Sequence, residues 1–215
     1  DNGWIAMKSG NSVMTLGGER KLFSGSIYRI ENDPTIGPPE VKLDTLHPDL
    51  SDCAVFSEPG VLPKSNGIYV SLFCATLPAP GRIILLRCGH AMNNCNYLGV
   101  LIDGSEAAAL NSSYDNFSAS ELVAVNGEDY LVVTPSAGET YRGCVMYRIT
   151  DLELASIERV GGAAKATALI EAHGQFNGAC GYVEGLGGSG MLISEAFTTS
   201  LPIFRLFTTG YNFQE

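Results

Sequence analysis

Two glutamates occupy similar stretches of this chain, and paired carboxyl groups carry out general acid and base chemistry. Glu58 lies in FSEPGVLPKSNGIYVSLF (56–73), and Glu121 lies in FSASELVAVNGEDYLVVT (117–134). Inverting hydrolysis of a glycosidic bond needs two carboxyl groups about 6.5–9.5 Å apart, of which one is protonated and the other activates water. Burial or a neighbouring negative charge keeps a carboxyl group protonated. Glu58 and Glu121 are therefore the candidate catalytic residues, and the alternative is a polar strand residue with structural contacts only.

Flat aromatic rings that stack on sugar faces would complete a carbohydrate site. Tyr141 and Tyr182 are the candidate substrate-binding residues of this kind. Tyr69 and Tyr130 stand at similar places in the two stretches, and we expect them to pack between strands instead. No metal site is predicted, because the six cysteines include no C-x-x-C pair and the three histidines have no ligand spacing.

The composition indicates a folded chain and argues against several classes of partner. Of the 215 residues, 45% are hydrophobic and only 17% are charged, which is too apolar for a disordered chain. The formal net charge of -10 repels phosphate groups, so nucleic acids and anionic membranes are poor candidate partners. No apolar run approaches the roughly 18 residues of a membrane-spanning helix.

Nearly all of the chain consists of short apolar runs between Gly, Pro, Asn and Asp, a pattern that predicts an all-β fold. The one helical candidate is GAAKATALIEAH (162–173), of which 168–171 could equally be a strand. The runs fall into four groups within a single domain, with approximate bounds of 1–50, 51–110, 111–162 and 163–215.

The two glutamate-bearing stretches are copies of one another at an offset of 61 residues. Phe56 aligns with Phe117 and Glu58 with Ala119, so that Glu121 lies two residues further along its strand. A repeated antiparallel unit of this period predicts a β-propeller of four-stranded blades, and a β-sandwich is the alternative. The segments 56–62 and 117–123 would then be equivalent inner strands.

Two details of the copies lead to further expectations. Asn66-Gly67 and Asn126-Gly127 are predicted to be hairpin turns, but their separation is one residue shorter than the offset of 61 between the copies. This difference predicts that one residue is gained and one is lost around the turn. Because strand side chains alternate between faces, Phe56 should lie beside Glu58 and raise the pKa of that carboxyl group.

These stretches resemble the recurrent unit of five-bladed, furanosidase-like propellers, above all those of glycoside hydrolase family 43. In that unit an acidic residue precedes a proline or a small residue on the first strand, and a hairpin leads to a Tyr-rich second strand. The segment EAHGQFNGACGYVEGLGGSGMLISE (171–195) is similar to the closing blade, in which a His-Gly pair lies near the axis. About four blade units are visible.

The resemblance implies three carboxylates that point into a central funnel from different blades: a base, an acid, and a residue that orients the acid. It assigns two of these places to Glu58 and Glu121. It also gives His173 the place of the axial histidine. The one cofactor that the resemblance allows is a central Ca²⁺ ion near His173, and no other cofactor is expected. The family's base stands in an Asp-Pro pair, for which only Asp33-Pro34 is available, in a Pro-rich loop.

We therefore expect a carbohydrate-active propeller that acts as a glycoside hydrolase on arabinose- or xylose-containing glycans. The alternatives are a non-catalytic propeller that binds a glycan or a protein, and part of a longer glycosidase-like protein. Because four units fall short of five blades, self-association could complete the ring.

Cysteine usage and the start of the chain indicate a secreted or periplasmic protein. The chain opens at Asp1 rather than Met, and no membrane anchor is visible. Cys88 and Cys95 bracket a six-residue loop and are the pair expected to bond after export, although two buried thiols are an alternative. Asn111 and Asn116 begin N-x-S sequons, which matter only in a host that glycosylates.

Overall fold

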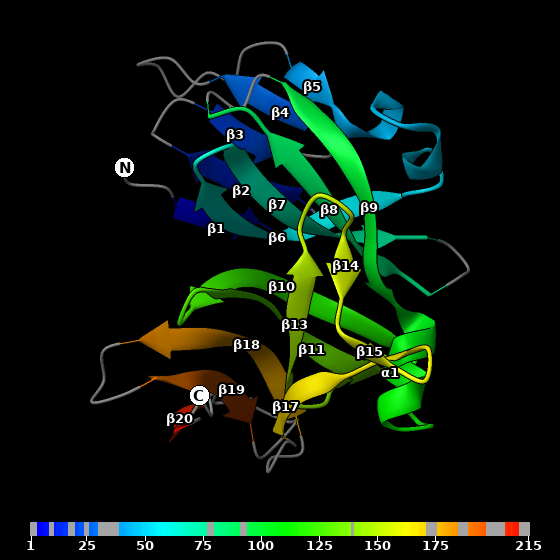
Figure 1. Cartoon of the computed structure of the whole chain (residues 1–215), viewed down its shortest axis with the longest axis vertical. Helices are drawn as coiled ribbons and strands as arrows, with labels where there is room; N and C mark the ends of the chain where they lie inside the picture. Colours follow the sequence, from blue (N-terminus) through cyan, green and yellow to red (C-terminus); the bar gives the residue numbers. More distant parts are fainter. Residues whose placement is uncertain are drawn as a thin grey trace.

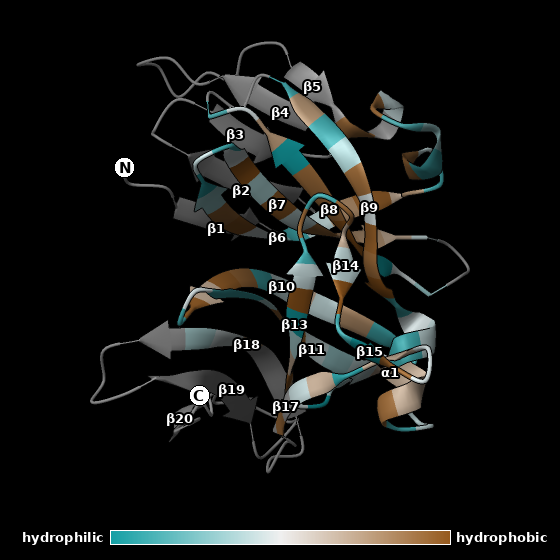
Figure 2. Cartoon of the chain, viewed as in Figure 1, coloured by the Kyte–Doolittle hydropathy of each residue, from teal (hydrophilic) through white to brown (hydrophobic). Residues whose placement is uncertain are grey.

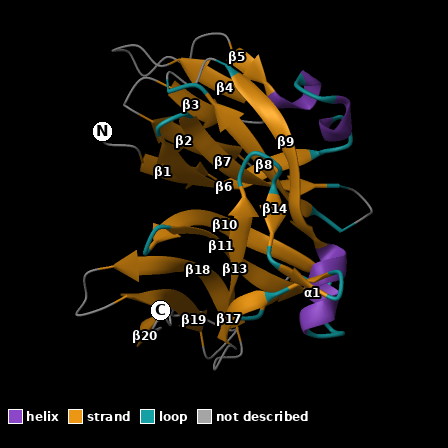
Figure 3. Cartoon of the chain, in the orientation of Figure 1, coloured by secondary structure: helices purple, strands orange, loops and turns teal. Residues whose placement is uncertain are grey.

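The computed structural model describes residues 4–8, 11–16, 20–23, 26–29, 39–76, 80–90, 94–138, 140–170, 176–184, 189–196 and 205–210. Antiparallel strands make up most of these residues (Figure 3). The helical elements among them are one short α-helix, α1 (Gly104–Leu110), and two turns of 3-10 helix, η1 (Leu43–Thr45) and η2 (Pro48–Leu50). The prediction of an all-β chain is confirmed. Within the described ranges, none of the helices combines the length and the apolar character that crossing a membrane requires.

The first two units are antiparallel sheets in which every strand pairs with the next strand in the sequence. The first unit consists of β1 (Trp4–Lys8), β2 (Asn11–Leu16), β3 (Arg20–Phe23), β4 (Ser26–Arg29) and β5 (Pro39–Lys42). The second unit consists of β6 (Val55–Lys64), β7 (Gly67–Ala75), β8 (Arg82–Cys88) and β9 (Cys95–Asp103). The second unit thus has the four-stranded form of a propeller blade.

The third and fourth units share one hydrogen-bonded sheet. The third unit consists of β10 (Asn116–Val125), β11 (Glu128–Ala137), β13 (Cys144–Asp151), β14 (Ser156–Ile157) and β17 (Ala166–Ile170). The fourth consists of β18 (Phe176–Glu184), β19 (Ser189–Ala196) and β20 (Arg205–Gly210). The short strand β12 (Thr140–Tyr141) joins the two units, because it pairs with β11 on one side and with β18 on the other.

The interpretation of 162–173 as a helix is wrong, and the strand alternative holds for its described part. β15 (Arg159–Val160) and β16 (Ala163–Ala164) form a separate hairpin, and β17 pairs with β13. Alanine has a high intrinsic helix propensity, but pairing with a neighbouring strand overrides it. Because β17 belongs to the third unit, that unit extends beyond residue 162.

The units follow one another in chain order, with their first strands side by side. Figure 1 shows β1, β6, β10 and β18 in succession from the first unit to the fourth. Propeller blades are arranged in this way around their centre. The sheets do not close into a ring within the described residues, which is consistent with an incomplete propeller. The predicted equivalence of 56–62 and 117–123 as inner strands is confirmed.

The two copies have the same irregularity in their backbone. Pairing in the β6–β7 hairpin shifts register between Ser57 and Gly60, and the β10–β11 hairpin shifts at the matching residues. Within this bulge, Glu58 and Ala119 have φ angles of 51° and 52°, in the left-handed region that few non-glycine residues adopt. The alignment of Glu58 with Ala119 is therefore confirmed.

The expected one-residue displacement at the hairpin turns is wrong. In the second copy, Asn126 and Gly127 form a two-residue turn at φ 52° and 82°, as a type I′ turn requires. In the first copy the turn is Ser65-Asn66, and Gly67 already belongs to β7. The offset of 61 residues therefore continues through the turn with no residue gained or lost.

Hydrophobic clusters pack on both sides of the second unit and between the third and fourth units. Figure 2 shows hydrophobic residues along the strands of the second and third units. Tyr69 lies in the cluster that joins these two units, and Tyr130 lies in the cluster that joins the third unit to β18. The prediction that these rings pack between strands is confirmed.

All six cysteines form disulfides. The predicted Cys88–Cys95 bond is present, and its Cα atoms are 3.9 Å apart because the two residues face each other across β8 and β9. Cys53 is bonded to Cys74 within the second unit. The third bond, Cys144–Cys180, covalently connects the third unit to the fourth.

Replacing Gly60 with alanine is expected to destabilise the fold by about 1–3 kcal/mol, because it overpacks the contact between β6 and β10. A Cβ atom at Gly60 would lie 2.5 Å from Ser71 Oγ and 2.8 Å from both Glu121 Cα and Leu122 N. The last two are backbone atoms, so β10 itself would have to move. Urea unfolding measures the change.

The matched control is the same substitution at Gly89, where the nearest atom to a new Cβ is 3.9 Å away. This variant should stay within about 0.5 kcal/mol of the parent. Equal effects at the two positions would mean that β6 and β10 are not in close backbone contact.

Candidate functional site

Glu58 extends from the bulge of β6 toward the third unit. Its Oε2 accepts a hydrogen bond from the Ala119 N–H at 2.5 Å, and its carbonyl oxygen accepts one from the Ser120 hydroxyl at 2.7 Å. Burial raises the pKa of the Glu58 carboxyl group, and the Ala119 N–H partly offsets this by lowering it. Glu58 therefore holds its proton to a higher pH than an exposed glutamate.

The expectation that Phe56 and Glu58 share one face of their strand is wrong. Phe56 packs into a cluster with η1 and η2, whereas the Glu58 carboxyl group contacts β10 on the other side. The bulge interrupts the regular alternation of side chains, because Glu58 adopts the left-handed conformation. Burial at the contact between β6 and β10, rather than the Phe56 ring, is the source of the raised pKa.

Tyr141 brings the edge of the fourth unit to Glu58. Strand β12 pairs Tyr141 with Ser136 in β11 and with Asn177 in β18. Burial raises the pKa of the Tyr141 phenol, the charge of Glu58 raises it further, and the Ser118 hydroxyl lowers it. Both groups therefore lie close to the phenol. We refer to Glu58, Ser118 and Tyr141 as the junction cluster.

Ser118 is a member of this cluster that the sequence analysis missed. Its side chain is buried, and its hydroxyl lies close enough to the Tyr141 phenol to lower the pKa of that phenol without meeting the full geometry of a hydrogen bond, and it has no other partner among the described residues. Buried hydroxyl groups are normally satisfied, so this one is suited to bind a water molecule or a ligand hydroxyl. Its alignment with Ser57 beside Glu58 is the signal that could have identified it.

Glu121 makes the same kind of contact one unit further along. Its Oε2 accepts a hydrogen bond from the Tyr182 N–H in β18 at 2.8 Å. A Cβ atom at Gly181 would lie 2.9 Å from this oxygen, so a larger residue at position 181 would displace the carboxyl group from its present place. Burial raises the pKa of Glu121, and the Tyr182 N–H lowers it.

The structure thus divides the candidate residues into two pairs. Glu58 lies near Tyr141, whereas Glu121 contacts the backbone of Tyr182. The Tyr182 side chain packs against the hydrophobic cluster between the third and fourth units. His173 lies outside the described residues, so its place and that of a central Ca²⁺ ion stay predictions.

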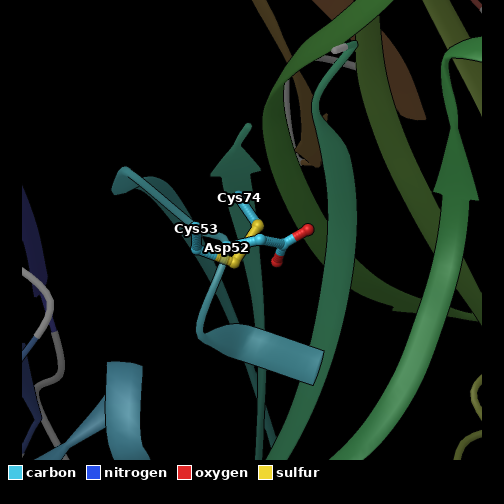
Figure 4. A group of neighbouring side chains, drawn as sticks. All are labelled: Asp52, Cys53 and Cys74. Carbon is cyan, nitrogen blue, oxygen red and sulfur yellow. A yellow bond between two sulfur atoms is a disulfide. The ribbon is translucent and has the colours of Figure 1, made fainter. Parts of the chain in front are cut away.

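One group of potential metal ligands occurs among the described residues, and it is better explained without a metal. Asp52 lies beside Cys53 and Cys74 (Figure 4). The two sulfur atoms are bonded to each other, so neither is a thiolate, the form that binds metals. Asp52 instead pairs with Arg82 at 2.5 Å, which lowers the pKa of its carboxyl group.

Solved structures of similar architecture are glycosidases. A thermostable family-43 glycoside hydrolase aligns with a TM-score of 0.58 and 11% identity, over 98% of this chain and 72% of that one. An α-L-arabinanase from Cellvibrio cellulosa, complexed with arabinohexaose, aligns with a TM-score of 0.53 and 10% identity, over 96% of this chain and 68% of that one. A GH32 β-fructofuranosidase from Bombyx mori aligns with a TM-score of 0.54 and 17% identity, over 89% of this chain and 42% of that one. The fold is that of a β-propeller, as in these glycosidases.

This propeller fold confirms the resemblance drawn from the repeated blade stretches. The identities of 10–17% establish similarity of fold alone. The chain spans about two fifths of the Bombyx mori enzyme and roughly 70% of the other two. No protein-family model and no curated protein sequence matches the chain.

Proposed function

We propose that this furanosidase-like propeller binds arabinose- or xylose-containing glycans and hydrolyses them with Glu58 as the acid. The observation that carries the proposal is the junction cluster, in which a carboxyl group of raised pKa lies near a phenol and a buried hydroxyl. All three come from inner strands or from β12, which borders the inner strand β18. Small-molecule sites combine a few convergent polar groups of this kind with aromatic walls.

The backbone at Glu58 supports a role for its side chain. A non-glycine residue in the left-handed region costs about 1–2 kcal/mol, which glycine would avoid. Ala119 adopts the same conformation, so the bulge is a general feature of the blade unit. Of the second and third units, only the second has a carboxyl group at this position of the bulge. A carboxyl group at a strained position fits a functional site.

Glu121 is the proposed second carboxyl group, acting as the base that activates water. The proposal of a pentose-containing substrate is supported by the Cellvibrio cellulosa arabinanase, which has the same fold and whose structure contains arabinohexaose. Hydrolysis requires the two glutamates to hold different protonation states at the same pH.

The second candidate function is a propeller that binds a glycan without cleaving it. The observation in its favour is that each glutamate accepts a backbone hydrogen bond from the next unit. Such contacts hold neighbouring blades together and need no catalytic role. In this alternative, Tyr141 and Ser118 would provide the binding contacts.

Titration calorimetry tests the binding common to both candidates. Arabinan- and xylan-derived oligosaccharides are expected to bind with a Kd of about 1 μM to 1 mM, the range in which KM values of enzymes usually fall. Tyr141→Ala should weaken binding about 2- to 10-fold, because it removes the ring proposed to face the sugar.

Glucose-based oligosaccharides of the same length are the control ligands, and they should bind more weakly. Failure of every arabinose- or xylose-containing oligosaccharide to bind would contradict both candidates. Unaltered binding by Tyr141→Ala would place the glycan away from the junction cluster.

A further inference from the structure

The loop between α1 and β10 exposes one of the chain's two N-x-S sequons. Asn111, Ser112 and Ser113 are all exposed, and Asn111 is the C-terminal cap of α1. Figure 3 shows α1 and the loop that follows it at the edge of the molecule. A bulky group on Asn111 would therefore extend into solvent without displacing any part of the sheets.

The local geometry at Asn111 leaves its amide nitrogen available. The backbone N–H and the hydroxyl group of Ser113 both donate to Asn111 Oδ1, at 3.0 and 2.9 Å. These contacts form an Asx turn that uses the oxygen of the side chain. Among the described residues, none hydrogen-bonds to Asn111 Nδ2, the atom that carries a sugar in N-linked glycans.

The second sequon, which starts at Asn116, is part of the folded sheet. Asn116 pairs with Ser136 across β10 and β11, and its Oδ1 accepts the Phe117 N–H at 2.9 Å. Phe117 is only 1% exposed and Ser118 only 8%. A glycan here would have to fit against the packed β10–β11 hairpin, so the two sequons differ sharply in accessibility.

We infer that Asn111 is an N-glycosylation site and that Asn116 is not. The reaction joins Asn111 Nδ2 to the anomeric carbon of an oligosaccharide carried on a lipid diphosphate. The anomeric C–O bond to the diphosphate breaks, the lipid diphosphate leaves with the bonding electrons, and Nδ2 loses a proton. The pairing of all six cysteines supports passage through an oxidising compartment, where this modification takes place.

Expression of the full chain through the secretory pathway of a eukaryotic cell tests the inference. Secreted and cell-retained protein are both treated with peptide N-glycosidase in heavy-oxygen water, and peptides are sequenced by mass spectrometry. We expect labelled aspartate at position 111 and unmodified asparagine at position 116 in the folded protein.

Two variants remove the sequon in different ways and serve as cross-checks. Asn111→Gln and Ser113→Ala should each abolish the glycan, whereas Asn116→Gln should leave the mass of the glycoprotein otherwise unchanged. A glycan on Asn116 of the folded protein, or unmodified Asn111 in both fractions, would overturn the inference. Chain made in a bacterial cytoplasm provides the unglycosylated mass reference.

Discussion

Replacing Glu58 with glutamine is expected to lower the turnover of aryl arabinofuranosides or aryl xylosides by about 10²-fold or more. Glutamine keeps the length of the side chain and an oxygen that accepts the Ala119 N–H. It cannot supply a proton, so the loss of rate would report acid catalysis rather than loss of the contact between units. Initial rates at saturating substrate measure the effect, and KM should change little.

The pH dependence of the same reaction tests this role independently. Burial raises the pKa of Glu58, and an acid catalyst must be protonated, so turnover should fall as the pH rises through that raised pKa. The contribution of Glu58 to the free energy of unfolding also falls as the pH rises. It is complete below the ordinary glutamate pKa of about 4.3 and is lost as the pH rises through the folded-state value. Glu58→Gln should remove both dependences on this group.

Glu128→Gln is the matched control, because Glu128 pairs with Arg148 on the surface, away from the junction cluster. Its turnover should stay within about twofold of the parent rate. If the parent protein is active and its Glu58→Gln variant keeps the full rate, Glu58 is not the acid. A parent that binds pentose glycans but hydrolyses no glycoside would favour the non-catalytic candidate.

The blade units could be predicted from the sequence because their signals are local and repeated. Alternating apolar residues and turn residues mark each strand, and Phe56 with Phe117 anchors the copies. A third copy starts at Phe176 in β18, where pairing again shifts register, between Asn177 and Cys180. This copy has little signal in the sequence, because few of its other residues match.

The geometry of the candidate site could not be predicted in the same way. Strict alternation placed Glu58 beside Phe56, but the bulge turns the carboxyl group toward the next unit. The contact of Glu121 with Tyr182 joins residues 61 positions apart and depends on how two units pack. The proximity of Tyr141 to Glu58 likewise depends on β12, a strand of two residues that has no clear sequence signal.

Removing the Cys144–Cys180 disulfide is expected to destabilise the chain by about 4 kcal/mol. The bond closes a loop with a sequence separation of 36 residues, and the loss of chain entropy in the unfolded state grows with loop length. The bonded residues are buried between the third and fourth units, so alanine at both positions avoids leaving buried free thiols, although it removes the sulfur atom to which the Thr134 hydroxyl donates at 3.4 Å. Urea unfolding of Cys144→Ala/Cys180→Ala measures the loss.

Cys88→Ala/Cys95→Ala is the matched control, because its bond spans only seven residues within one hairpin. The same relation predicts a loss of about 2 kcal/mol for this shorter loop. Limited proteolysis should also separate the two variants. Cleavage between the third and fourth units should accelerate only when Cys144–Cys180 is removed, since no other disulfide connects them. Equal stability losses, with unchanged cleavage between these units, would mean that packing and β12 pairing alone hold the fourth unit in place.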